Sequence, residues 1–112
     1  MEITQTKHGD ILVIGPKGKL DANTSKMFED RLIPLIDQGH KKILADFSQL
    51  DYISSAGLRV LLLAARKLSD GGGKIALCSL KPSIKTVFDI AGFSAVFSIF
   101  TTQEDGITGF TK

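Results

Sequence analysis

Short apolar runs alternate along this chain with longer stretches in which apolar residues recur every three or four positions. The short runs are typical of buried strands, and the longer stretches are typical of helices with one buried face. The predicted strands cover residues 3–7, 11–14, 43–47, 74–78 and 96–100. The predicted helices begin near Asn23 or Thr24, at Ser55 and at Pro82, and a weak last helix follows Thr101 or Thr102.

This order of elements predicts an α/β fold. Residues 3–7 and 11–14 flank a turn at residues 8–10, so we expect them to pair as an antiparallel N-terminal hairpin. Helical crossovers between the remaining strands predict a mixed, mostly parallel sheet of four to five strands with three to four helices. A chain of 112 residues is close to the commonest domain size, so we expect a single domain over residues 1–112.

Functional groups in such sheets gather at the carboxyl ends of strands. The clearest place of this kind is the polar loop predicted at residues 48–54, which leads into the strongest helix pattern of the chain. We expect Ser54 to cap this helix and Ser55 to hold its first position, with Ile53 packing back onto Leu58. Gly57 lowers helix propensity by about 1 kcal/mol relative to alanine, and we expect it to leave the helix start bare for another surface.

Several of the polar residues near these turns also have a purely structural interpretation. On spacing alone Ser54 and Ser55 are helix caps, and Asp21 fits a turn or a cap. Asp46 is expected to satisfy loop amides, and Arg59 to lie exposed on its helix. In the first helix, Pro34 is expected to bend the helix or end it early, because proline donates no backbone hydrogen bond.

Composition and charge narrow the function classes. The net charge is +2 with both signs interspersed, and the longest basic run is residues 40–42, so a nucleic-acid partner is not expected. The longest apolar stretch is residues 60–65, so neither a membrane span nor a secretory signal is expected. The single cysteine, Cys78, is interpreted as a small buried hydrophobe in a reducing cytosol, with a reactive thiol as the alternative.

Motifs of catalysis and metal binding do not occur in the sequence. His8 and His40 stand far apart, without cysteines at metal-binding spacing. The glycine run at residues 71–73 ends a helix and precedes a strand, whereas phosphate-binding loops precede helices. We therefore expect neither enzyme activity nor a cofactor nor a metal ion.

Residues 52–58 (YISSAGL), which follow residues 46–48 (DFS), are similar to the signature of the STAS family, whose type members are bacterial anti-sigma factor antagonists. The resemblance covers most of the chain and runs in the family's order. It extends to residues 18–21 with Thr24, to residues 72–75 and to residues 83–93.

The resemblance implies a partner-switching mechanism. An unphosphorylated antagonist binds an anti-sigma factor that is also a serine kinase. The kinase phosphorylates a serine at the start of the second helix, which breaks the complex until a metal-dependent serine phosphatase reverses the modification. The matching residue here is Ser55. The preceding residue is often aspartate in the family and is Ser54 here, so Ser54 is an alternative phosphorylation site.

By the same resemblance we expect a bacterial, cytoplasmic phosphoprotein that regulates transcription and binds no membrane. The partner-binding residues implied are Asp21, Asn23, Thr24, Ser54, Ser55, Ala56, Gly57 and Arg59. A phosphoserine adds about −1.5 to −2 charges, which the start of a helix tolerates. We therefore expect the phosphate to act at the contact surface by repulsion and desolvation, with Asp21 and Asp51 adding to the repulsion.

Two alternative functions are compatible with the same fold. STAS-like domains also serve as structural adaptors in transporter or signalling complexes, without control of a sigma factor. Phosphorylation can also regulate a target other than a sigma-factor pathway, such as a secretion or metabolic regulator. Fold and motif alone do not separate these functions.

Overall fold

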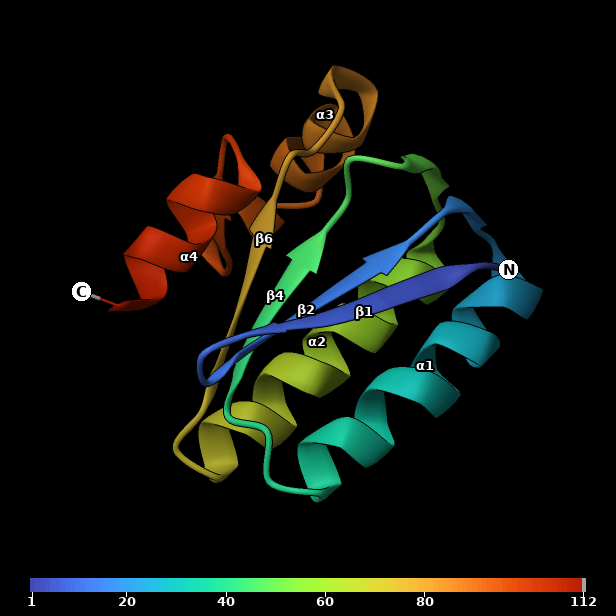
Figure 1. Ribbon diagram of the computed structural model, residues 1–112. Coiled ribbons are helices and arrows are strands. Elements are labelled where there is room, and N and C mark those ends of the chain that lie inside the picture. Colours follow the sequence, from blue (N-terminus) through green and yellow to red (C-terminus); the bar gives the residue numbers. More distant parts are fainter. Residues whose placement is uncertain (112) are drawn as a thin grey trace.

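The computed structural model describes residues 1–111, and five of its strands form one mixed sheet (Figure 1). Strands β1 and β2 make the antiparallel hairpin, and the other neighbours in the sheet are parallel, as predicted. In spatial order the strands are β1 (Ile3–His8), β2 (Ile11–Pro16), β4 (Lys42–Asp46), β6 (Lys74–Cys78) and β7 (Ser98–Phe100).

Helices cover both faces of this sheet (Figure 1). Successive side chains of a strand point to opposite faces, so Leu12 and Ile14 of β2 face the larger core while Ile11 and Val13 face a smaller one. The helices of the described residues are α1 (Ala22–Asp37), α2 (Ser55–Asp70), α3 (Pro82–Ile90), the 3₁₀ turn η1 (Phe93–Ala95) and α4 (Gln103–Thr111).

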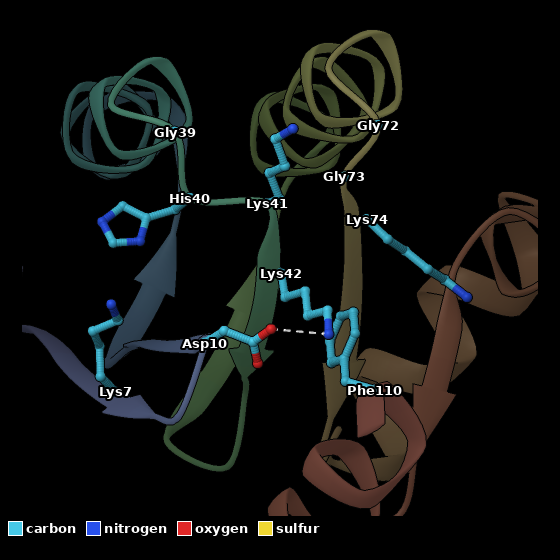
Figure 2. Close-up of a pocket in the computed structure, with 10 residues that line it drawn as sticks. All are labelled: Lys7, Asp10, Gly39, His40, Lys41, Lys42, Gly72, Gly73, Lys74 and Phe110. Carbon is cyan, nitrogen blue, oxygen red and sulfur yellow. Dashed lines mark ion pairs between the residues drawn. The ribbon is translucent and has the colours of Figure 1, made fainter. Parts of the chain in front are cut away.

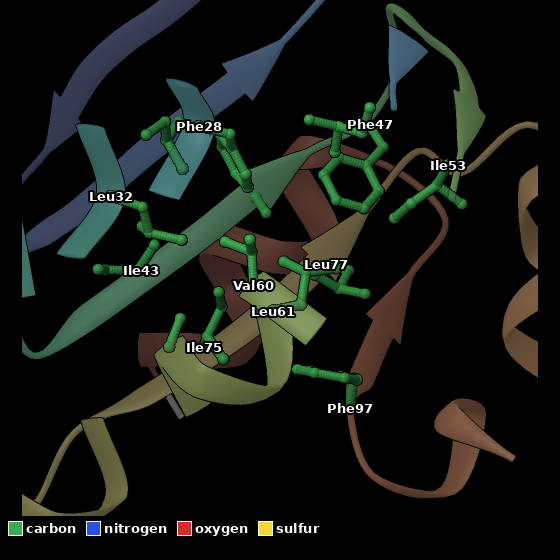
Figure 3. Close-up of a cluster of buried hydrophobic side chains, with 14 of the residues drawn as sticks. Phe28, Leu32, Ile43, Phe47, Ile53, Val60, Leu61, Ile75, Leu77 and Phe97 are labelled. Atoms are coloured by element: carbon green, nitrogen blue, oxygen red, sulfur yellow. The ribbon is translucent and has the colours of Figure 1, made fainter. Parts of the chain in front are cut away.

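The larger core lies between the sheet and the pair α1 and α2 (Figure 3). Phe28 and Leu32 of α1 and Leu61 of α2 are fully buried there against Ile43 and Leu77 of the sheet. The smaller core lies under α4, whose Phe110 packs on the opposite side of the sheet. Burial of these apolar faces on both sides fixes the central strands and therefore the loops at their ends.

The predicted loop at residues 48–54 is wrong in one respect, because strand β5 (Leu50–Ile53) lies within it. Strand β5 pairs in parallel with the short strand β3 (Gly18–Leu20) as a separate two-stranded sheet. Leu50 and Ile53 are buried, whereas Asp51 and Tyr52 between them are exposed. That spacing of three lacks the alternation typical of strands, which is why the pattern favoured a loop.

The start of α1 also differs from the prediction. The N-cap is Asp21 rather than Asn23 or Thr24, and its Oδ1 accepts bonds from the amides of Asn23 (3.0 Å) and Thr24 (2.9 Å). The Thr24 hydroxyl in turn accepts from the Asp21 amide at 2.9 Å, which completes a capping box. Both helix-start residues thus satisfy backbone groups that would otherwise lack partners.

Pro34 does not end α1 early, since the helix continues to Asp37. Proline sits only one turn before the end, so few backbone bonds depend on it. The Pro34 carbonyl accepts from the Gln38 amide at 2.9 Å, and Leu35 stays buried in the core. Packing of the last turn therefore outweighs the loss of one helical bond.

Helix α4 carries Gly106 and Gly109, which lower its helix propensity. Both glycines allow α4 to approach the sheet closely. A Cβ on Gly106 would stand 2.8 Å from Leu44 Cδ1, and one on Gly109 would overlap the Phe100 ring. Thr102 caps the helix by accepting from the Asp105 amide at 3.0 Å, which agrees with the predicted start.

Candidate partner-binding site at the start of helix α2

Helix α2 begins at Ser55, with Ser54 as its N-cap, as predicted. The Ser54 hydroxyl accepts from the Gly57 amide at 3.4 Å, and the Ser54 carbonyl accepts from the Leu58 amide at 3.0 Å. The Ser54 amide donates to the Leu20 carbonyl at 2.8 Å. These bonds hold the first turn of α2 against the end of β3.

The Ser55 side chain is exposed at this helix start. Among residues 1–111, no group forms a hydrogen bond with its hydroxyl, so the oxygen is free to react. The free amides and the positive end of the helix dipole favour a negative group at this position. The geometry therefore suits a reversible charge-changing modification at Ser55.

We expected Gly57 to leave the start of the helix bare, and this expectation is wrong. Gly57 is buried, and a Cβ placed on it would lie 2.8 Å from Ile53 Cγ1 and 3.1 Å from Leu20 Cβ. The missing side chain lets α2 pack closely on the two-stranded sheet. Gly57 therefore supports the site from beneath. Ile53 and Leu58, which we expected to pack on each other, both belong to the larger core.

The start of α1 lies beside the start of α2, because Leu20 contacts Ser54 and directly precedes Asp21. Asp21 and Asn23 are exposed and Thr24 is half-buried. The amide and then the hydroxyl of Thr24 hold the pKa of the Asp21 carboxyl below its usual value. Asp21 is therefore ionised at neutral pH, and it lies at the same end of the molecule as the exposed Ser55 hydroxyl.

Residues of α1 and α2 line a groove of about 400 Å³ next to this helix start. Ala56 and the exposed Arg59 belong to the residues implied by the sequence. The sequence interpretation missed the remaining lining residues, although positions 56, 59, 60 and 63 follow the spacing of one helix face. They are Ala22, Ser25, Lys26, Glu29, Val60 and Leu63.

Two carboxylates near the site are already engaged. Asp51, expected to add to repulsion, forms an exposed ion pair with Lys81. Asp46 has the structural role that we predicted: Oδ1 accepts from the Ser48 amide at 2.9 Å and Oδ2 from Gln103 Nε2 at 2.8 Å. Asp46 thus ties the end of β4 to its loop and to α4.

Residues 1–111 contain no cluster of three His, Cys, Asp or Glu side chains suited to a metal ion. Burial raises the pKa of the Cys78 thiol to about 11, with the Asp46 charge as a smaller cause. Cys78 is fully buried, which matches its interpretation as a small hydrophobe. No helix in this part of the chain has the length and apolar character to cross a membrane.

Another hollow lies at the opposite end of the sheet, at the amino ends of β4 and β6 (Figure 2). Its volume is about 580 Å³, and Asp10 pairs there with Lys42 at 3.0 Å. Lys7 and Lys74, remote in sequence, join the predicted basic run at residues 40–42 around it. Residues 72–74 of the family resemblance line this hollow, but none of the partner-binding residues that the resemblance implies does.

The model of the STAS domain family matches residues 2–106, which is nearly the whole chain. The chain belongs to the STAS family. Its relatives also place this STAS protein with the anti-sigma factor antagonists. BtrV of Bordetella bronchiseptica, which is classed with those antagonists, is 36% identical over 98% of this chain and 95% of BtrV. The anti-sigma-B factor antagonist of Bacillus subtilis is 26% identical over 80% of this chain and 82% of its own.

Solved structures show the same STAS fold. The anti-sigma factor antagonist SpoIIAA in its unphosphorylated form matches with a TM-score of 0.86 at 22% identity, over 98% of this chain and 96% of that one. Phosphorylated SpoIIAA, described as a Bacillus cell fate determinant, matches with a TM-score of 0.77 at 22% identity, over 97% and 99%. The family gives this STAS protein a regulatory rather than a catalytic role.

Proposed function

We propose that this STAS protein is a phosphorylation-regulated anti-sigma factor antagonist. Unphosphorylated, it binds an anti-sigma factor that is also a serine kinase, and phosphorylation of Ser55 releases that partner. The observation that carries the proposal is the exposed Ser55 hydroxyl at the first position of α2. A metal-dependent serine phosphatase restores the binding form, and the cycle runs in the cytoplasm.

Phosphorylation at Ser55 is compatible with the fold for two reasons. The start of α2 carries unpaired amides and a positive dipole end that stabilise an anion. The side chain points to solvent, so a phosphoryl group displaces none of the buried packing. The phosphorylated form of SpoIIAA, which keeps the same fold, supports this argument.

The phosphate acts instead on the surface that the partner contacts. That surface consists of the two helix starts and comprises Asp21, Asn23, Thr24, Ser54, Ser55, Ala56 and Arg59, supported from beneath by Gly57. A group with about two negative charges must lose water when a partner covers it, and like charges on the partner repel it. Both effects weaken binding without any change in the fold.

The test is to capture the partner from the native organism with Ser55→Ala as bait and to produce it recombinantly. Incubated with ATP and this partner, the wild type and Ser54→Ala should each gain the mass of one phosphoryl group, whereas Ser55→Ala should gain none. Phosphorylation that persists in Ser55→Ala and disappears in Ser54→Ala would move the site to Ser54.

The adaptor function predicts a different outcome. A STAS protein that serves only as a structural adaptor carries no phosphate in native cells. Intact mass of the protein from those cells, with and without phosphatase treatment, separates the two functions. An unchanged mass under every growth condition, together with capture of a partner that is no anti-sigma factor, would contradict the proposed function.

A further inference from the structure

Helices α1 and α2 lie side by side (Figure 1), and the groove between their N-terminal halves contains a buried hydroxyl without a partner. Ser25 is 2% exposed, and among residues 1–111 its Oγ forms no hydrogen bond. The Ser25 amide donates to the Asp21 carbonyl at 2.9 Å, so only the side chain lacks a partner. Buried hydroxyls nearly always form hydrogen bonds, so the Ser25 hydroxyl is a donor for which residues 1–111 provide no acceptor.

The rim of the groove on α2 is basic. Arg59 lines the groove and is exposed, and a second hollow of about 320 Å³ continues from it along α2 to Arg66. Within the described part of the chain, neither arginine forms an ion pair. Glu29 is the carboxylate of the groove lining. An occupant with acidic groups therefore fits the α2 rim.

The floor between these polar groups is apolar. Leu63 lines both hollows and is 38% exposed, so part of its apolar surface is open to solvent. Val60 and Ala56 continue the same face of α2 toward Ser55. The groove thus offers an apolar strip, cationic groups at its edge and one buried donor.

We propose that this groove docks an acidic, amphipathic segment of the partner protein. An apolar side chain of that segment packs on Leu63, a carboxylate pairs with Arg59, and an acceptor takes the hydrogen bond of Ser25 Oγ. The inference rests on the proposed function, because it assumes that phosphorylation of Ser55 releases the partner. Ser55 stands one helical turn before Arg59, so its phosphate repels the acidic segment and also competes for the same guanidinium.

The free protein provides the first test. Ser25→Ala removes a hydroxyl that is buried without a partner, so the unbound protein should melt about 4 °C higher than the wild type. Ser69→Ala, at an exposed position of α2, is the control for the better helix propensity of alanine. A melting temperature of Ser25→Ala that rises no more than that of Ser69→Ala would show that the hydroxyl is not an unsatisfied donor.

The second test locates the occupant. A photo-crosslinking residue at position 63 is compared with one at position 90, because Ile90 is a large aliphatic residue on a different helix and is also exposed, at 83%. Crosslinking is done in extracts of the native organism with the Ser55→Ala form, and crosslinked peptides are identified by mass spectrometry. We expect position 63 to capture a segment rich in Asp and Glu, and position 90 not to capture it.

The hydroxyl should then be needed for that capture. Adding Ser25→Ala should lower the affinity of the crosslinked segment, made as a synthetic peptide, about tenfold, although the same change stabilises the free protein. Opposite signs for stability and binding are not expected of a residue with only a structural role. A peptide affinity that Ser25→Ala leaves unchanged would overturn the proposed contact.

The outcomes separate this inference from the proposed function. Capture of an acidic segment from a protein that is no anti-sigma factor would support the groove and contradict the sigma-factor role. Capture of an anti-sigma factor by Ser55→Ala without any crosslink at position 63 would support the role and overturn the groove. A basic or wholly apolar segment at position 63 would also overturn the proposed chemistry.

Discussion

The Ser54 amide donates a hydrogen bond of 2.8 Å to the Leu20 carbonyl. Leu20 precedes Asp21, which caps α1, and Ser54 caps α2. This bond therefore joins two helix starts whose caps are 33 residues apart in the sequence. Neither the Asp21 carboxylate nor the Ser55 hydroxyl takes part in it. A backbone bond therefore joins the two helix starts, and the exposed Ser55 hydroxyl remains available for a partner.

The first prediction concerns the charge at Ser55. Ser55→Asp should melt within about 2 °C of the wild type, because an acidic residue in the first turn interacts favourably with the helix dipole. It should bind the anti-sigma factor at least about tenfold more weakly, since a carboxylate on the contact surface must be desolvated. Differential scanning calorimetry and titration calorimetry measure the two quantities.

Ser69→Asp is the matched control for this charge. It places the same carboxylate in the last turn of α2, where an anion is unfavourable, so it should lower the melting temperature slightly and leave partner binding unchanged. Unfolding of Ser55→Asp would mean that the charge acts through the fold. Equal loss of binding in both variants would mean that net charge alone weakens the complex.

The second prediction tests the support beneath the site. Gly57→Ala gains about 1 kcal/mol of helix propensity but places a Cβ 2.8 Å from Ile53 Cγ1. Overpacking of a core contact costs about 1–3 kcal/mol, so we expect a net loss of stability of about 1 kcal/mol. Urea unfolding at equilibrium measures this free energy.

Gly71→Ala gives the comparison for Gly57→Ala. Gly71 caps the other end of the same helix, and a Cβ there would meet atoms no closer than 3.7 Å. Its φ of −94° suits alanine, so the substitution should be neutral or slightly stabilising. A Gly57→Ala protein as stable as Gly71→Ala would contradict the close packing of α2 on the small sheet.

The third prediction is a dependence of stability on pH. Bonds from the amide and hydroxyl of Thr24 lower the pKa of Asp21, so the folded state binds a proton there less readily than the unfolded state. The stabilisation is complete above the unfolded pKa near 3.8 and is lost as the pH falls through the lower folded value. Asp21→Asn keeps an acceptor without a charge, so its melting temperature should fall less steeply below pH 4.

Thermal unfolding of both proteins from pH 6 to about pH 2.5 measures this difference. Because other carboxylates titrate equally in the two proteins, the difference between the curves isolates Asp21. Parallel curves over this range would show that the cap has no electrostatic preference for the charged form.

Much of the frame is predictable from the sequence, because burial on one or both faces leaves a periodic pattern. The runs at 11–14 and 74–78 and the serine pair at the start of α2 identified strands and a helix start correctly. Strand β5 escaped this reasoning, because its partner β3 has three residues and the register shifts between Gly18 and Lys19. Pairing of such short segments depends on tertiary contacts more than on local pattern.

The candidate site was predictable in its centre and not in its surroundings. Ser55 followed from a helix signal and a family motif, whereas the role of Gly57 depended on where Ile53 packs. Ser25 gave no signal, since one serine in an amphipathic helix is common and its isolation appears only when α2 covers it. Such sites arise where segments distant in sequence meet.

The last prediction uses Cys78 as a probe of the whole frame. Burial raises the pKa of its thiol to about 11, so almost no thiolate exists at pH 8, and the side chain is 0% exposed. A disulfide reagent such as DTNB should therefore react with the native protein only through unfolding, and fully in denaturant. Gly57→Ala should accelerate the reaction about fivefold if it lowers the free energy of unfolding by about 1 kcal/mol. Ser55→Asp should leave the rate unchanged, because its charge acts at the surface. Rapid labelling of the native wild type would instead reveal local opening at β6, and the two variants would then no longer differ in rate.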